Sequence, residues 1–369
     1  MNRILFLILA LMGSQLAFSQ LSLTMLPSGG NKKASVSEQI GLTRVSIHYD
    51  RPAVKGRDGK IWGELVHAGY TDQQFGTSKA APWRAGANEN TTIEFSTEVR
   101  IEGQVLPAGK YGFFIAWDPS VCTLIFSKNA GSWGSYFYNE NEDALRITVK
   151  PLSSSTSVEW LKYEFTDQTE NSAVISLQWE KIIIPFKVEV DYIHTQIASF
   201  RQELRTEKGF FWLAWNQAAN WCLQRNVNLE EALLWADSAT SINFGGDRVF
   251  NAWVTKSKIL EKLGRKEEAR TVMQKALPIA GMTDLHQYGR QLLTLKQPRE
   301  AFSVFKMNFE KYPGQFTTLM GMARGYSGLG DYKNALKYAS MALPLSPDEL
   351  NKKAVEGIIT KLKEGKDIN

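Results

Sequence analysis

The sequence predicts two domains of different class, an N-terminal antiparallel β-sandwich followed by a C-terminal α-helical solenoid. Three observations support this prediction. The chain has 369 residues, which suits two domains of ordinary size. Up to residue 191 it consists of short runs that alternate between apolar and polar residues, and beyond that point helical periodicity replaces them. With 43% hydrophobic and 22% charged residues, the composition excludes a disordered, collagenous or many-span membrane protein.

The first residues have the pattern of a secretory signal peptide. Arg3 precedes the apolar stretch 4–12, and Ala17 and Ser19 are small residues at the positions that a signal peptidase reads. The stretch is shorter than the roughly 20 residues needed to span a bilayer. We therefore expect residues 1–19 to be removed and the chain to reside outside the cytoplasm, in the periplasm or secreted. No later stretch is apolar enough for a transmembrane segment.

After an N-terminal tail at 20–33, residues 34–191 have the pattern of an antiparallel β-sandwich. Residues 91–96 alternate cleanly, and residues 100–106 have a polar, glycine-containing centre that is typical of a hairpin. Nine or ten strands fit this length. The other strands are expected at 44–50, 110–117, 121–126, 144–150, 158–165, 173–180 and 182–190.

Residues 192–209 are expected to be a linker, and 210–369 to be helical hairpins of the tetratricopeptide repeat (TPR) class. Ala335 has counterparts 34 residues earlier at Ala301 and a further 32 residues earlier at Ala269, and Gly289 stands where the motif needs a small residue. Small residues are required where helix backbones touch. We expect four hairpins followed by a capping helix at 350–363; an unrelated helical bundle is the alternative.

Charge is distributed unevenly between the two domains. Residues 20–195 hold 17 Lys and Arg against 20 Asp and Glu, whereas residues 196–369 hold 25 against 18. In the repeat register the ninth residue of each unit faces the concave surface, and these positions are Lys258, Arg290 and Arg324. Lys262 lies one turn beyond Lys258.

This basic groove predicts a protein or peptide partner with an acidic segment. Ordinary solvated charges are the alternative. The positive charge is too mild, and the expected compartment is wrong, for a nucleic-acid partner.

Two loops of the β-domain hold candidate ligand-binding residues. Residues 51–60 carry Arg51, Lys55 and Arg57 among glycines, which suits an anion and equally suits a solvated turn. The second loop, residues 82–90, crowds four polar and aromatic side chains into a few positions: Trp83, Arg84, Asn88 and Glu89. These side chains could bind a sugar or peptide, or else brace a corner of the sandwich. We expect Arg57, Arg84 and Glu89 at one end of the sandwich, with Glu89 paired to a cation.

A third candidate combines aromatic and acidic residues. Trp133 and Tyr136 alternate with small residues and could present flat faces to a sugar, although aromatics at strand spacing more often belong to a core. The neighbouring carboxylates Glu140, Glu142 and Asp143 could serve a glycosidase or could simply be solvated.

Other chemistry is sparse in this sequence. The four histidines are scattered and lack an i,i+4 pair, so no metal site is expected. No phosphate-loop, dinucleotide or nucleophile-elbow motif is present, and no cofactor is expected. Cys122 and Cys222 fall in different domains and are expected to be small buried hydrophobes.

Several motifs together resemble a secreted bacterial family of unknown function, DUF2911. The matching runs are Asp50-Arg51-Pro52, Lys55-Gly56-Arg57, Ile61-Trp62-Gly63, Trp83-Arg84, Gly86-Ala87-Asn88-Glu89, Leu106-Pro107-Ala108-Gly109, Trp179-Glu180-Lys181 and Pro185-Phe186. The resemblance covers about residues 34–190. It implies a secreted, mostly β domain placed before TPR repeats, and it implies no activity or catalytic residue. Residues 69–81 form a longer link than the family pattern has.

These observations favour a non-enzymatic binding or scaffold protein. The β-sandwich would recognise a glycan or small molecule, and the repeats would bind a protein. The alternative is a hydrolase acting on glycan or peptide, with Glu89 or Glu142 as acid or base, which lacks a recognisable nucleophile and base set.

Overall fold

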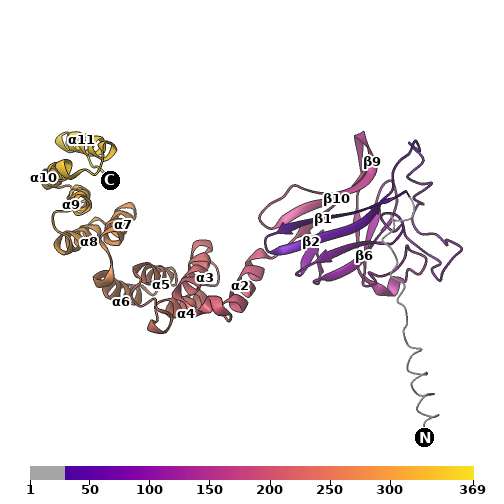
Figure 1. Cartoon of the computed structure of the whole chain (residues 1–369), viewed down its shortest axis with the longest axis horizontal. Coiled ribbons are helices and arrows are strands. Elements are labelled where there is room, and N and C mark those ends of the chain that lie inside the picture. The colour runs from indigo at the N-terminus through magenta and orange to yellow at the C-terminus, as the bar shows by residue number, and fades with distance from the viewer. Residues whose placement is uncertain (1–29) are drawn as a thin grey trace, which may run out of the picture. The chain divides into compact units, whose positions relative to one another are not determined.

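The computed structural model describes residues 30–369, which form two compact units divided between Gln196 and Ile197 (Figure 1). The signal peptide expected at 1–19 lies outside the described residues.

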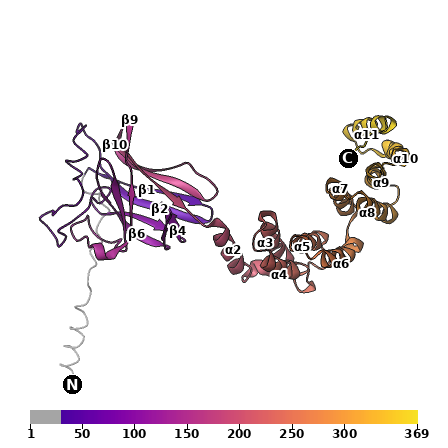
Figure 2. The ribbon, with the colours of Figure 1, turned by 180° about the vertical axis from the view of Figure 1, so that it is seen from behind.

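The first unit contains ten described strands in two antiparallel sheets (Figures 1 and 2). The larger sheet has the order β1-β2-β3-β6-β7-β8 and the smaller has the order β5-β4-β10-β9. The strands are β1 Lys32–Ile40, β2 Thr43–Arg51, β3 Thr91–Phe95, β4 Val99–Ile101, β5 Gln104–Leu106, β6 Gly109–Ala116, β7 Cys122–Ser127, β8 Asp143–Val149, β9 Leu152–Thr166 and β10 Ser172–Glu189.

The core of this unit lies between the two sheets. Phe113 of β6 and Phe126 of β7 contact Phe186 of β10, with ring centroids 5.6 and 6.1 Å apart. All three side chains are almost completely buried. The alternating residues of both sheets thus meet in one apolar layer, and the predicted β-sandwich is confirmed.

Two features differ from the sequence prediction. Strand β1 begins in the last two residues of the predicted tail and continues to Ile40, where no strand was predicted, because it is an edge strand whose exposed residues are polar. The predicted strands 173–180 and 182–190 are one continuous strand, β10. Its register shifts on both sides of Glu180, which has a φ of +51°, so a bulge rather than a turn interrupts the pattern.

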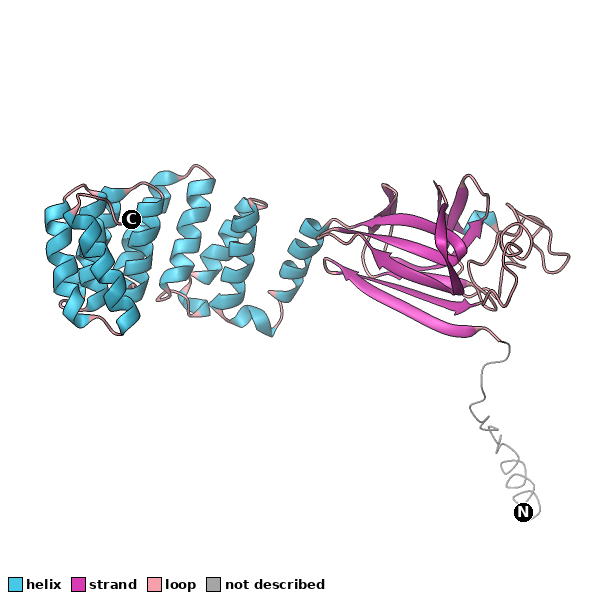
Figure 3. Ribbon diagram, turned by 90° about the horizontal axis from the view of Figure 1, so that it is seen from above, coloured by secondary structure: helices cyan, strands magenta, loops and turns pink. Residues whose placement is uncertain are grey.

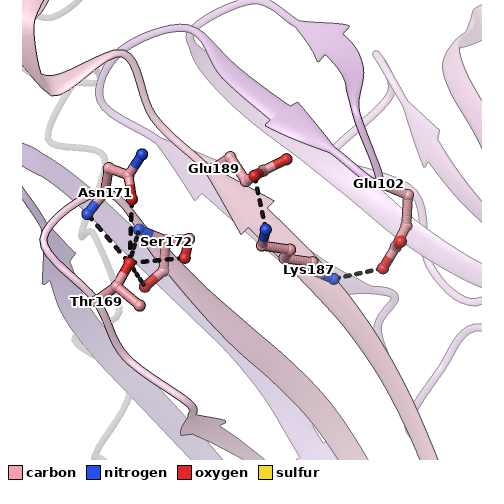
Figure 4. A network of polar contacts seen from close by, with 6 residues as sticks. All are labelled: Glu102, Thr169, Asn171, Ser172, Lys187 and Glu189. Atoms are coloured by element: carbon pink, nitrogen blue, oxygen red, sulfur yellow. Dashed lines mark hydrogen bonds and ion pairs between the residues drawn. The ribbon is translucent and has the colours of Figure 1, made fainter.

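Polar contacts hold the ends of β10 in place (Figure 4). In the turn before β10, the Thr169 hydroxyl lies 2.8 Å from that of Ser172 and accepts a hydrogen bond from the Asn171 backbone N–H at 3.3 Å. Near its other end, the Lys187 backbone N–H donates to a Glu102 carboxylate oxygen at 2.6 Å. The first contacts order the turn before β10, and the Lys187–Glu102 hydrogen bond joins β10 to the turn between β4 and β5.

The rest of the chain is helical (Figure 3). Helix α2 falls in the stretch 192–209, which the sequence predicted as a linker. Four hairpins and a capping helix follow, as predicted for TPR-like repeats. The helices are α2 Tyr192–Glu203, α3 Trp212–Arg225, α4 Leu229–Ala239, α5 Phe250–Lys262, α6 Lys266–Ala276, α7 Met282–Thr294, α8 Pro298–Lys311, α9 Phe316–Gly328, α10 Tyr332–Ala342 and α11 Glu349–Lys363.

Small residues allow the hairpins to pack closely. The fully buried ring of Phe305 lies against Gly289 and Gly321, where an added Cβ would come within 2.5 and 2.8 Å of its atoms. Ala301 and Ala335 are both completely buried. The small-residue register read from the sequence therefore corresponds to real contact points between helices.

Each of the two cysteines is buried as a free thiol in its own unit, as expected. Burial raises the pKa of both Cys122 and Cys222 to about 11, so each behaves as a small apolar side chain at neutral pH. Among residues 30–369, no helix has the length and apolar character that crossing a membrane requires.

Candidate functional site

Two long connections meet at one end of the β-sandwich. The connection from β2 to β3 spans 52–90, and that from β7 to β8 spans 128–142. The Ser78 backbone N–H donates to the Tyr136 carbonyl at 2.9 Å, and the Asn90 N–H donates to the Ser132 carbonyl at 3.5 Å. These contacts bring together loop residues that are distant in the sequence.

The first predicted anion loop is braced internally. Arg57 donates from Nε to the Val54 carbonyl at 2.9 Å and from Nη2 to the Ala53 carbonyl at 2.6 Å. Arg51 donates from Nε to the Leu161 carbonyl of β9 at 2.7 Å. Lys55 is exposed. The two guanidinium groups thus stabilise the loop and its contact with β9 and leave little capacity for an anion.

Trp83 belongs to the core and not to a ligand surface. Only 8% of it is exposed, and its indole N–H donates to the Gly86 carbonyl at 3.1 Å. Its ring stacks with that of Trp179 at 6.1 Å and meets that of Trp62 edge-on at 5.5 Å. Aromatic packing explains this residue without a ligand.

Arg84 connects the two loops through aromatic faces. Its guanidinium carbon lies 5.7 Å from the Trp133 ring centroid and 5.4 Å from that of Tyr136, and these two rings stack at 6.2 Å. Nη1 donates to the Asn88 carbonyl at 2.8 Å. Gly134, at φ +68°, leaves room for the guanidinium, because a Cβ there would lie 2.9 Å from it.

Exposed aromatic side chains continue this arrangement. Trp133 is 56% exposed and Phe137, in the same aromatic run, is 51% exposed. Phe75, which was not predicted from the sequence, is 64% exposed. The Phe75 ring meets that of Tyr136 edge-on at 5.2 Å. We call Phe75, Trp133, Tyr136 and Phe137 the aromatic patch. Flat exposed rings beside a cation could stack with a sugar or another planar ligand.

Glu89 is paired with a cation, as predicted, but the cation is Lys33 of the unpredicted strand β1 and not Arg57 or Arg84. Lys33 Nζ lies 2.6 Å from Glu89 Oε2 and 3.2 Å from Asp50 Oδ2. Hydrogen bonding with Asp50 and then with Lys33 lowers the pKa of Glu89 to about 2. Burial, followed by hydrogen bonding with Glu89, raises the pKa of Asp50. Asp50 is therefore the member of the pair that holds a proton more readily.

The acidic cluster in the β7–β8 connection is largely engaged within the loop. The buried Asp143 carboxylate accepts hydrogen bonds from the Tyr138 hydroxyl at 2.6 Å and from Arg146. Burial is the main cause that raises the pKa of Asp143. Glu140 lies 3.4 Å from Arg146, and Glu142 does not join this network. The cluster orders the loop.

The predicted groove residues occupy two places in the helical unit. Lys258 lines a cleft of about 350 Å³ between the second and third hairpins, together with Arg270, Tyr288 and Leu292. Burial lowers the pKa of Lys258. Lys262 is exposed at the end of α5.

Arg290 and Arg324 lie together on the first helices of the third and fourth hairpins. Burial and then the charge of Arg290 lower the pKa of the half-buried Arg324. Burial, Arg324 and Arg290, in that order, lower the pKa of His286 on α7 to about 4. No acidic side chain among residues 30–369 forms an ion pair with either arginine. We call His286, Arg290 and Arg324 the basic cluster. His286 lies one turn before Arg290 on α7 and was not predicted from the sequence as part of the groove.

The scattered histidines do not converge. Within residues 30–369, no group of three His, Cys, Asp or Glu side chains is arranged to hold a metal ion.

Fold and sites together define the class of protein, a β-sandwich domain joined to TPR hairpins. Residues 31–188 match the family described as "Protein of unknown function (DUF2911)", and residues 250–280 match a tetratricopeptide repeat family. The chain therefore combines a DUF2911 domain with TPR repeats, and such repeats are the units of protein-interaction scaffolds.

Relatives of known identity match only part of the chain. Tetratricopeptide repeat protein 8 of Mus musculus is 33% identical over 82 residues, which are 22% of this chain and 16% of the mouse protein. Among solved structures, YrrB, described as a TPR protein with an unusual peptide-binding site, is 18% identical with a TM-score of 0.29, covering 46% of this chain and 86% of its own. MamA of Desulfovibrio magneticus RS-1 is 20% identical with a TM-score of 0.27, covering 41% and 92%.

Proposed function

We propose that this protein is an extracytoplasmic binding scaffold whose TPR hairpins hold a partner protein through an acidic segment. The observation that carries the proposal is the basic cluster. Arg290 lies close enough to Arg324 for its charge to help lower the pKa of Arg324, and no carboxylate among residues 30–369 forms an ion pair with either arginine. Like charges held together on a rigid helical face are stabilised by an anionic ligand.

The cleft at Lys258 supports the same function. Lys258, Arg270 and Lys266 line it together with apolar side chains, including Tyr288 and Leu292. A partner segment that carries a carboxylate next to an apolar side chain would satisfy both kinds of group. Lys262 would add to the attraction at longer range.

The β-sandwich supplies a second recognition module in this proposal. Its aromatic patch, with Arg84 behind it, suits a glycan or another small molecule with a flat face. The pattern of residues 1–19 supports a periplasmic or secreted location. A Trp133→Ala variant should lose binding to a glycan panel, while Phe211→Ala, an exposed aromatic change in the helical unit, should leave it unchanged.

The decisive experiment for the scaffold is a pull-down from an envelope extract at low salt. The bait is the wild-type chain or a variant with Lys258, Arg290 and Arg324 all changed to Glu. A partner should be captured by the wild type, lost with the variant and weakened by salt, because exposed charge contacts are screened within about 8 Å at physiological ionic strength. A matched control changes Lys306, Lys333 and Lys353, which lie on the second helices and the cap, to Glu. An identical partner set for both variants and the wild type would end the proposal.

The hydrolase alternative receives weaker support. Glu89 has a pKa of about 2 and is therefore a poor proton donor at neutral pH. A pH-rate profile on glycan and peptide substrates decides the matter, since turnover that Glu89→Gln abolishes would favour an enzyme.

A further inference from the structure

Three residues of this chain lie on the fourth hairpin beside the basic cluster. After α11 ends, residues 367–369 run along α9 and contact two of its side chains, Arg324 and Ser327. Arg324 Nη1 donates to the Ile368 carbonyl at 3.2 Å. The Ser327 hydroxyl donates to Asp367 Oδ1 at 2.6 Å and accepts from the Ile368 backbone N–H at 3.2 Å.

These contacts engage groups that most extended peptides carry. One backbone carbonyl, one backbone N–H and one side-chain carboxylate are bonded, and the Asn369 amide adds a bond to the Arg324 carbonyl at 3.1 Å. The half-buried Ile368 side chain packs against the apolar cluster that includes Ala323 and Leu362. An acidic residue followed by an apolar one therefore fits this surface.

The position of these contacts links them to the basic cluster. Arg324 belongs to that cluster and also bonds Ile368, and the Asp367 carboxylate opposes the lowering of the Arg324 pKa. Residues 367–369 thus bring the Asp367 carboxylate close enough to Arg324 for its charge to act on that guanidinium. Arg290 remains without an ion pair among residues 30–369, so the cluster is only partly neutralised.

We propose that residues 367–369 occupy in cis the part of the α9 face that binds an extended acidic–apolar segment of the partner in trans. This inference rests on the proposed scaffold function and adds a regulatory feature to it. The partner must displace residues 367–369, so its apparent affinity is the intrinsic affinity multiplied by the fraction of molecules in which the face is free. Because residues 367–369 are tethered to α11 by a short segment, their effective concentration at the α9 face is in the millimolar range. At that concentration a few exposed hydrogen bonds are enough for residues 367–369 to occupy the face in many molecules.

The first test measures binding of a fluorescein-labelled peptide with the sequence of residues 363–369 to the full chain by anisotropy. We expect weak binding to the wild type and binding about fivefold tighter or more to an Asp367→Ala/Ile368→Ala variant, in which the face is vacated. Adding Ser327→Ala to that variant should remove the gain. Lys363→Ala, an exposed change on α11, is the control and should bind as the wild type does. Equal affinities for the wild type and the vacated variant would overturn the proposal.

Amide exchange provides a second and independent measurement. The Ile368 N–H donates to Ser327 Oγ at 3.2 Å and to Asp367 Oδ1 at 2.8 Å, so it should exchange more slowly than in a free peptide. Asp367→Ala removes the second acceptor, and adding Ser327→Ala to that variant should restore fast exchange. Unprotected Ile368 in the wild type would show that the cis contact does not persist.

The two proposals can fail separately. If the triple Glu variant loses its partner but vacating residues 367 and 368 brings no gain in affinity, only the cis occupancy is wrong. If the triple Glu variant keeps its partners, the scaffold proposal is wrong, whatever the exchange of Ile368 shows.

Discussion

Lys33 on the first strand holds Glu89 on the loop before the third strand, with Nζ and Oε2 2.6 Å apart. The same ammonium reaches Asp50 at 3.2 Å, directly across the β1–β2 ladder. Both Lys33 and Glu89 are about half exposed, so their ion pair by itself contributes little to stability. The buried partner, Asp50, has the larger effect on how stability depends on pH, because its Oδ1 atom has no hydrogen-bond partner among residues 30–369.

An Asp50→Asn variant should gain stability relative to the wild type as the pH rises. The pKa of Asp50 is raised in the folded protein, so its contribution is fully present below the unfolded pKa of about 3.9 and is lost as the pH rises through the folded pKa. Asparagine does not titrate. The difference in melting temperature between variant and wild type should therefore be more positive at pH 7 than at pH 3.5. Asp58→Asn, on an exposed loop, controls for the lost charge, and a difference that falls with pH would contradict this account.

Arg57→Ala should destabilise the β-sandwich by about 1–2 kcal/mol, because two backbone carbonyls lose a charged donor. Arg57→Lys should not restore stability, since an ammonium cannot reproduce the forked geometry. Urea unfolding measures the change, with the exposed Lys60→Ala as the control. A stable Arg57→Ala variant that loses ligand binding would instead favour the anion-loop interpretation.

Gly289→Ala should destabilise the helical unit by about 1–3 kcal/mol, because the added methyl group meets the Phe305 ring. Gly357→Ala on α11 is the matched control. Nothing lies within 4 Å of a Cβ there, so that change should stabilise by about 0.5–1 kcal/mol through helix propensity. Thermal unfolding followed by circular dichroism at 222 nm compares them, and equal effects would contradict the close packing of α7 on Phe305.

Acidification should weaken the helical unit through His286. Its pKa is about 4 in the folded protein and about 6.5 in the unfolded chain, so the unfolded state binds more protons between these values and stability rises with pH there. From pH 7 to pH 5 the wild type should lose about 2 kcal/mol from this group. His286→Asn should reduce the loss, whereas the exposed His48→Asn should not. The same pH dependence in all three proteins would show that His286 is not the cause.

Local periodicity carried much of the fold. Alternation at 91–96 predicts β3, because successive side chains of a strand point to opposite faces. The recurrence of Ala269, Ala301 and Ala335 predicts the hairpins, because each repeat needs a small residue where its two helices touch. The same reasoning missed β1, whose edge position leaves its polar residues in solvent. It also divided β10 in two, because a bulge at Glu180 breaks the alternation without ending the strand.

The sequence by itself determined the two domain classes, the hairpin register and which residue types crowd into the loops. Only the tertiary structure decided which of those residues meet. Strand pairing placed Lys33 opposite Asp50, and packing between two loops placed Arg84 over the Trp133 ring. The return of the chain after α11 placed Ile368 against Arg324. Each of these contacts joins segments 17 to 49 residues apart, and their formation depends on the pairing and packing of whole elements rather than on any local pattern.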